Sequence, residues 1–203
     1  MKIFLRDRNP HLVQAWKDVF GEFKDIHISC GDIFQEGEHL DVESIVSPSN
    51  SFCYMDGGID YVYSNFFGWG IGDLLREKIW TEHDGELLVG QAVVVDMRET
   101  NSKYLAERNR TEKIPFLISA PTMRIPLNVS NTVNAFLAFR AALKAARKHG
   151  ITSVLCPGLA TAIGKMAPTV CAKQMLEAYK QFLNPTFYDV LGDAHAAHHA
   201  MLA

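Results

Sequence analysis

The sequence predicts an α/β fold in which a mixed central sheet lies between two layers of helices. Short apolar runs rich in β-branched residues alternate along the chain with longer segments in which apolar residues recur at helical spacing. Two predicted strands, around Val93 and Phe116, follow one another with no helix between them, so the sheet is mixed rather than purely parallel. With 203 residues, we expect one well-packed three-layer domain, residues 1–203.

The first half of the chain contains three predicted strands and two helical regions. The strands are short apolar runs at residues 3–5, 26–30 and 45–46. Pro48 ends the third run before it is long enough for a helix. Helical spacing occurs at residues 12–20 and 59–83. The glycine-rich stretch 68–72 interrupts the second region, so we expect two helices or one broken helix there.

The second half continues the alternation of strands and helices. Strands are predicted at residues 91–97, 115–121 and 152–156, and helices at residues 131–149 and 168–182. Ser130 or Asn131 can cap the first of these helices, Gly150 ends it, and Pro168 opens the second. The polar and charged stretch 98–114, between two predicted strands, is predicted to be a segment exposed on the surface.

Composition excludes several classes of protein. The net charge is −3 and the chain has no block of basic residues, which argues against non-specific binding of duplex nucleic acid. The four cysteines form no Cys-x-x-Cys pair, so buried free thiols are favoured over disulfides or a zinc site. We find neither a signal peptide nor a membrane-spanning stretch, and we expect a cytoplasmic protein.

Two loops of small residues follow predicted strands. One leads from the strand at 45–46 through Gly57 and Gly58 to a helix start, an arrangement that can hold a phosphate on backbone N–H groups. The other spans residues 157–166. It is not a nucleotide-triphosphate P-loop, because five residues separate its glycines and Met166 follows the lysine. From the spacing alone, this loop can be either a tight strand-to-helix turn or a cradle for a diphosphate.

Taken singly, the polar residues near these loops have structural explanations. Asp60 can complement a helix dipole, and Asn50 and Asp32 can form turns. The aromatic residues that follow the first loop are predicted to be core residues: Phe66, Phe67 and Trp69. The histidines of the C-terminal segment are predicted to lie on a solvated helix: His195, His198 and His199.

Together, however, four segments in order along the chain resemble the macro domain, a family of ADP-ribose-binding modules. The segments are Gly31-Asp32-Ile33, residues 45–51, Gly57-Gly58-Ile59-Asp60 and residues 157–164. The stretch 120–126 also resembles the segment after a central strand in one branch of the family. Many members of this family remove ADP-ribose from proteins or nucleic acids.

The resemblance implies a role for each residue. Asp32, with no basic partner nearby, would accept a hydrogen bond from the adenine amino group beside Ile33, and Asn50 would bind distal ribose hydroxyls. Backbone N–H groups of two segments would hold the diphosphate and distal sugar: Gly57, Gly58 and Ile59 on one side, and Gly158 with Thr161, Ala162, Ile163 and Gly164 on the other.

The resemblance also implies a chemistry. In hydrolytic members a carboxylate at the Asp60 position is proposed to activate or position the attacking water, although the diphosphate or a bound water are alternative proton acceptors. Ser47, Asp56, Ala160 and Ala162 depart from the family pattern. ADP-ribose or an ADP-ribosylated macromolecule is the expected partner, and no metal or cofactor is required. A reader without catalytic activity, and a hydrolase or phosphatase of another nucleotide, are the rival interpretations; the oligomeric state stays open.

Overall fold

The centre of the computed structural model, which describes residues 1–98 and 113–203, is a six-stranded sheet in the order β2-β1-β6-β3-β5-β4. The strands are β1 (Lys2–Asp7), β2 (Ile26–Cys30), β3 (Ser44–Ser47), β4 (Val93–Asp96), β5 (Phe116–Ser119) and β6 (Ser153–Cys156). Neighbouring strands are parallel except at the edge, where β4 runs antiparallel to β5. The predicted mixed sheet is therefore confirmed.

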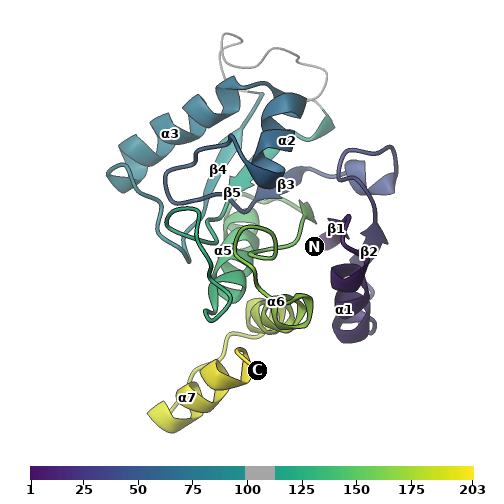
Figure 1. The fold of residues 1–203 in the computed structure, drawn as a ribbon, viewed down its shortest axis with the longest axis vertical. Coiled ribbons are helices and arrows are strands. Elements are labelled where there is room, and N and C mark those ends of the chain that lie inside the picture. The colour runs from purple at the N-terminus through teal and green to yellow at the C-terminus, as the bar shows by residue number, and fades with distance from the viewer. Residues whose placement is uncertain (99–112) are drawn as a thin grey trace.

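The helices cover both faces of this sheet (Figure 1). They are α1 (Pro10–Phe20), α2 (Gly58–Phe67), α3 (Gly70–His83), α5 (Asn134–Lys148), α6 (Pro168–Leu183) and α7 (Leu191–Ala200). Helices α2 and α3 lie on one face, and α5 and α6 on the other. The break predicted between residues 68 and 72 is present, since α2 ends at Phe67 and Gly68 takes a positive φ of 103°.

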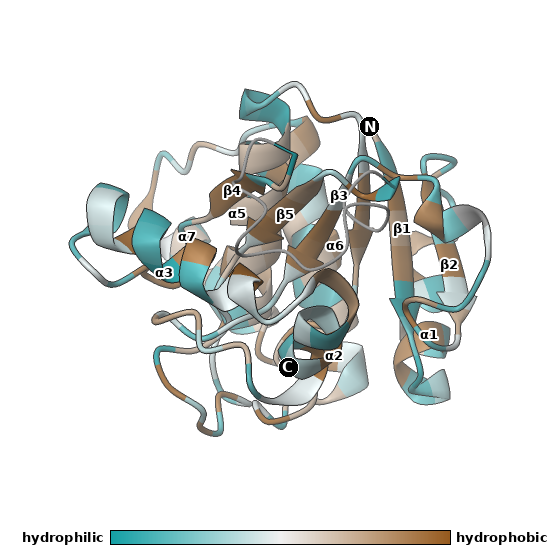
Figure 2. Ribbon diagram, turned by 90° about the horizontal axis from the view of Figure 1, so that it is seen from above, coloured by the Kyte–Doolittle hydropathy of each residue, from teal (hydrophilic) through white to brown (hydrophobic). Residues whose placement is uncertain are grey.

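Alternate strand residues face two separate hydrophobic clusters, as the pleat of a sheet requires. Neighbouring Ile45 and Val46 of β3 are both fully buried, the first on the α2–α3 side and the second on the α1–α5–α6 side. The central strands are predominantly hydrophobic along their length (Figure 2). Burial on both faces explains why these strands are continuous apolar runs rather than alternating ones.

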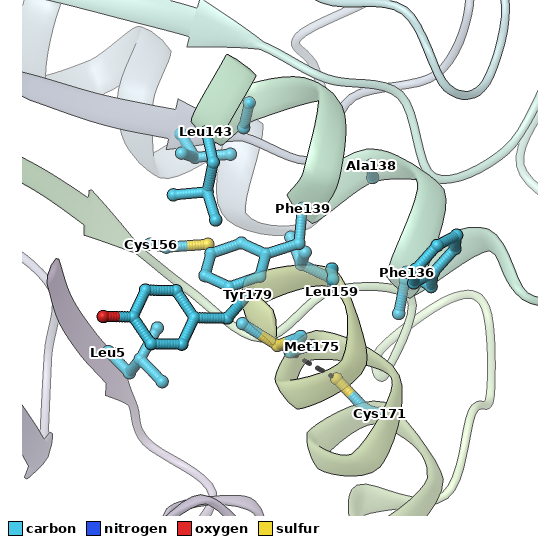
Figure 3. Packing of buried hydrophobic residues seen from close by; sticks show 14 of the residues in the cluster. Leu5, Phe136, Ala138, Phe139, Leu143, Cys156, Leu159, Cys171, Met175 and Tyr179 are labelled. Carbon is cyan, nitrogen blue, oxygen red and sulfur yellow. Dashed lines mark hydrogen bonds between the residues drawn. The ribbon is translucent and has the colours of Figure 1, made fainter. Parts of the chain in front are cut away.

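The larger cluster holds α6 against the sheet and against α5 (Figure 3). Phe139 of α5, Leu5 of β1 and Met175 of α6 are fully buried there. The indole N–H of Trp16 donates to the Met175 sulfur at 3.3 Å, which satisfies the polar atom of a fully buried side chain. Leu159, Ala160 and Met166 of the loop between β6 and α6 belong to the same cluster, so the core holds this loop in place.

Parallel pairing brings the carboxyl ends of the central strands to one edge of the sheet. Leu5 of β1 pairs with Cys156 of β6, and Ile45 of β3 pairs with Leu155. The loops that follow β1, β2, β3 and β6 therefore start side by side. Ligands bind at this edge in open α/β sheets, and both loops of small residues begin here.

Four predictions need correction or lie outside the structure. Helix α5 starts at Asn134 without a side-chain cap, so neither Ser130 nor Asn131 caps it. Trp69 is 57% exposed because it follows the break between α2 and α3 and packs on Tyr61 at the surface. Cys30 is exposed because it ends β2 at the edge of the sheet, whereas the other three cysteines are buried and all four are free. Most of the predicted surface segment, residues 99–112, lies outside the described residues.

Candidate functional site

A cleft lies at the edge of the sheet where β1, β3 and β6 end. It consists of two adjoining hollows of about 240 Å³ and 230 Å³. Both are lined by Asp7, Gly58, Ile59, Pro157 and Ala162, so they form one continuous groove. We call the larger hollow the Asp60 end and the smaller hollow the Asp32 end, after the carboxylate that lines each of them.

Asp60 lies in the first turn of α2 and is only 7% exposed. Its Oδ1 accepts a hydrogen bond of 2.6 Å from the hydroxyl of Ser47, the fully buried last residue of β3. Its Oδ2 accepts no hydrogen bond from any residue that the structure describes. This oxygen is not fully buried, and Asp60 lines the cleft. One carboxylate oxygen is thus fixed by the fold, and the other is left for whatever occupies the cleft.

The environment of Asp60 opposes its ionisation. Burial raises the pKa of Asp60 from 3.8 to about 7, and the hydrogen bond from Ser47 partly offsets this rise by stabilising the anion. No ion pair to Asp60 occurs among the described residues. A carboxylate with a pKa near neutrality, in a cleft and open on one oxygen, can exchange protons with a substrate.

The loop between β3 and α2 is held by Asn50. The Asn50 Oδ1 accepts from the backbone N–H of Phe52 at 3.1 Å and of Tyr54 at 3.4 Å, while its Nδ2 donates to the Tyr54 carbonyl at 3.1 Å. Asn50 also lines the Asp60 end of the cleft. Its side chain therefore has the bonding pattern of a turn former in addition to its position at the site.

The start of α2 presents backbone donors to the same cleft. The first N–H bonded within the helix is that of Tyr61, which donates to the Gly57 carbonyl at 3.2 Å, so the N–H groups of Gly58, Ile59 and Asp60 have no intrahelical acceptor. Gly58 takes a positive φ of 58°, and an added side chain at Gly57 or Gly58 would meet no atom within 4 Å. These glycines keep the N-terminus of the helix open to a ligand.

The opposite wall is the loop between β6 and α6. Its first predicted donor, the N–H of Gly158, is already bonded to Asp7 Oδ2 at 3.1 Å. Asp7 Oδ1 in turn accepts from Asn9 N–H at 2.8 Å, so this carboxylate ties the ends of β1 and β6 together. Farther along, Thr161, Ala162, Ile163 and Gly164 all line the cleft, and their N–H groups donate to no described residue.

Gly164 is required for the shape of this loop. A Cβ there would lie 2.4 Å from the Ala160 carbonyl oxygen and 2.8 Å from a Val129 methyl group. The Gly164 carbonyl also accepts a bond of 2.9 Å from Val129 N–H. Only a residue without a side chain fits at position 164, because the Ala160 backbone and the Val129 side chain pack directly against it.

We predict that Gly164→Ala lowers the free energy of unfolding by about 1–3 kcal/mol, since backbone must move to admit the methyl group. Gly57→Ala is the matched control, because its Cβ meets nothing within 4 Å and its φ of −143° suits any residue. Urea denaturation of both variants measures the difference. Equal stabilities would contradict the close packing at Gly164.

The Asp32 end differs from the sequence-based prediction in one respect. Ile33 lines it and is buried, as a base-contacting residue would be. Asp32 was expected to lack a basic partner, but its Oδ2 pairs with Arg8, because β1 and β2 are neighbours and Arg8 follows directly after β1. Asp32 Oδ1 accepts from Phe34 N–H at 2.9 Å.

Several lining residues were not singled out from the sequence. They include Asp7, Arg8 and Tyr54. Thr122, Met123 and Pro126 also line the cleft and lie in the stretch 120–126, for which the sequence implied a family resemblance but no role. Asp7 and Arg8 carried a usable signal, since both lie at the carboxyl end of a predicted parallel strand. Tyr54 carried none, because nothing in its local sequence distinguishes an exposed loop aromatic residue from a buried one.

The described part of the chain holds no group of three metal-ligating side chains, and none of its helices is long and apolar enough to span a membrane. The histidines of α7 lie on a helix without buried residues.

This chain is similar to known proteins in both sequence and structure. A family model described as "Macro-like domain" matches residues 34–183. An uncharacterized protein of Aquifex aeolicus is 30% identical over 158 residues, which are 78% of this chain and 82% of that protein. The macrodomain of Mycobacterium tuberculosis DarG shares 20% identity, covering 75% of this chain and 88% of its own with a TM-score of 0.56. A variant of the Oceanobacillus iheyensis macrodomain with ADPR shares 20% identity over 77% of each chain, with a TM-score of 0.58.

Proposed function

Because this chain belongs to the Macro-like domain family, we propose that its cleft binds ADP-ribose and hydrolyses a mono-ADP-ribosyl linkage or a related ADP-ribose ester or phosphate. One observation carries the hydrolytic part of the proposal. Asp60 lines the cleft with Oδ1 held by Ser47 at 2.6 Å and with Oδ2 uncommitted. A carboxylate oriented in this way is suited to a general base.

The order of the groups along the cleft supports one orientation of the ligand. Adenine occupies the Asp32 end against Ile33, and the distal ribose occupies the Asp60 end near Asn50. The diphosphate lies between them, where the N-terminus of α2 faces the loop 161–164. Unpaired N–H groups and the helix dipole favour an anion at that point without any basic side chain.

The proposed reaction is a displacement at the anomeric carbon of the distal ribose. A water held by Asp60 Oδ2 attacks that carbon, the carboxylate accepts the proton of the water, and the bond to the leaving group breaks. The proton then returns to the leaving group or to solvent. The carboxylate also stabilises the positive charge that develops on the sugar. A carboxyl with a pKa near 7 can take up and release a proton at neutral pH.

We predict that Asp32→Ala weakens binding of ADP-ribose by about tenfold or more, because the adenine amino group loses a charged acceptor. Calorimetric titration measures this change, and Asp18→Ala, an exposed carboxylate on α1, is the control with an unchanged dissociation constant. Failure of the folded parent protein to bind ADP-ribose would overturn the proposed function.

A non-catalytic reader of ADP-ribose is the second candidate, and the bonding of Asn50 favours it. The Asn50 Oδ1 already accepts from two backbone N–H groups and one Nδ2 N–H donates to the Tyr54 carbonyl, so a single N–H of this side chain remains to hold a ribose hydroxyl, which is sufficient for binding. Binding without turnover in the parent protein would identify the reader.

A further inference from the structure

The Asp32 end of the cleft carries a donor and an acceptor side by side. Arg8 pairs with Asp32 Oδ2, and both side chains line this end of the cleft. The Arg8 side chain is 72% exposed and that of Asp32 is 34% exposed, so both reach the surface on which a base would lie. Exposed ion pairs of this type contribute little to stability and open readily.

The surroundings hold Asp32 in place. Its Oδ1 accepts from Phe34 N–H, and its backbone carbonyl accepts a bond of 2.7 Å from the guanidinium of the buried Arg6. Arg6 is also bound to the Ser29 hydroxyl at 2.8 Å and to the Gln35 amide oxygen at 3.2 Å. Because its guanidinium is bonded to these three neighbours, Arg6 holds this side of the hollow in a fixed position.

Arg8, in contrast, retains unused donors. A guanidinium has five N–H donors in a planar fork. Only one terminal nitrogen of Arg8 is engaged by Asp32, and no other described residue accepts a bond from its side chain. Arg8 can therefore donate to a ligand without leaving Asp32.

A carboxylate beside a guanidinium is complementary to two kinds of purine edge. Adenine presents an amino donor beside the N1 acceptor. Hypoxanthine and guanine present the O6 acceptor beside an N1–H donor. Arginine is a common partner of O6, and carboxylates accept from base N–H groups. The apolar faces of Ile33, Ile59 and Val62 line the same hollow and contact a purine ring irrespective of its substituents.

We propose that this cleft binds 6-oxopurine nucleoside diphosphates as well as adenine nucleotides, with Arg8 as the residue that admits the 6-oxo group. The inference rests on the proposed function to the extent that the diphosphate must occupy the same cleft. Asp32 supplies the acceptor for either base and Arg8 the donor.

The test is calorimetric titration of the full chain with ADP, IDP and GDP. For the parent protein we expect dissociation constants for IDP and ADP that agree within about fivefold, less than the 1.4 kcal/mol that corresponds to tenfold. Arg8→Ala is expected to weaken IDP and GDP by about tenfold relative to ADP, because O6 then faces an unopposed carboxylate. Arg8→Lys should recover only part of this loss, since a lysine lacks the planar fork.

Lys17→Ala removes the same charge from the exposed face of α1 and should leave the IDP/ADP ratio unchanged, which separates readout of the base from a general effect of charge. Binding of ADP with rejection of IDP by the parent protein would overturn this inference and leave the proposed function intact. The same holds if Arg8→Ala weakens ADP and IDP equally. Absence of binding by both nucleotides and by ADP-ribose would overturn the proposed function itself.

Discussion

Replacing Asp60 with asparagine is expected to lower the turnover of an ADP-ribosylated substrate by roughly 10²–10⁴-fold, the usual contribution of a positioned general base. The amide keeps the size of the carboxylate and can still bond to Ser47, but it cannot accept the proton of the attacking water. Binding of ADP-ribose should change little, because the proposed contacts to adenine and diphosphate come from other residues.

Single-turnover kinetics and calorimetry on the same preparation separate these two effects. Asp18→Asn on the exposed face of α1 removes an equivalent carboxylate far from the cleft and serves as the control. If Asp60→Asn retains most of the parent turnover, Asp60 is not the general base, and the diphosphate or a second water accepts the proton instead.

The second large effect is a fall in stability as pH rises. The pKa of Asp60 is about 7 in the folded protein and close to 3.8 when exposed. Between these values the unfolded chain has released a proton that the folded protein still holds, so the free energy of unfolding decreases as pH increases. The full effect is about 4 kcal/mol, at 1.36 kcal/mol for each pKa unit.

Urea denaturation of the parent and of Asp60→Asn at about pH 5 and about pH 8 isolates this contribution. The parent should lose roughly 2–3 kcal/mol more than the variant between the two pH values. Other groups with shifted pKa values, such as His39 and Glu43, are common to both proteins and cancel in the difference. Parallel pH profiles for the two proteins would mean that Asp60 is not a buried acid with a raised pKa.

Much of the fold follows from local patterns. The run at 152–156 forms β6, a central strand whose last three residues are buried, as expected for a strand covered on both faces. The run at 26–30 forms the edge strand β2, in which only Ile26 is buried. The break between α2 and α3 was predicted from the glycine-rich stretch 68–72, and Gly68 indeed adopts a positive φ there. The α5 cap was predicted wrongly, because the helix begins at Asn134 with Val133 at the N-cap position, beyond both candidates, Ser130 and Asn131.

The site could be placed from the sequence but not assembled from it. Small-residue loops at strand ends located Gly57, Asp60 and the 157–164 segment, and the structure brings them together around one cleft. Their bonding depends on contacts between residues far apart in the chain. The Gly158 N–H donates to Asp7, which lies 151 positions away in the sequence. Arg8, after β1, forms an ion pair with Asp32, after the neighbouring parallel strand β2. No spacing rule contains that information.

The exposure of Cys30 has a practical consequence. Cys53, Cys156 and Cys171 are buried, and burial raises the pKa of each of these thiols, which makes them poor nucleophiles. Cys30 is exposed at the end of β2, and its sulfur lies 3.9 Å from the Arg8 carbonyl oxygen. The sequence thus supplies a single accessible attachment point for a fluorophore beside the Asp32 end of the cleft, where emission can report whether a nucleotide binds without an engineered cysteine.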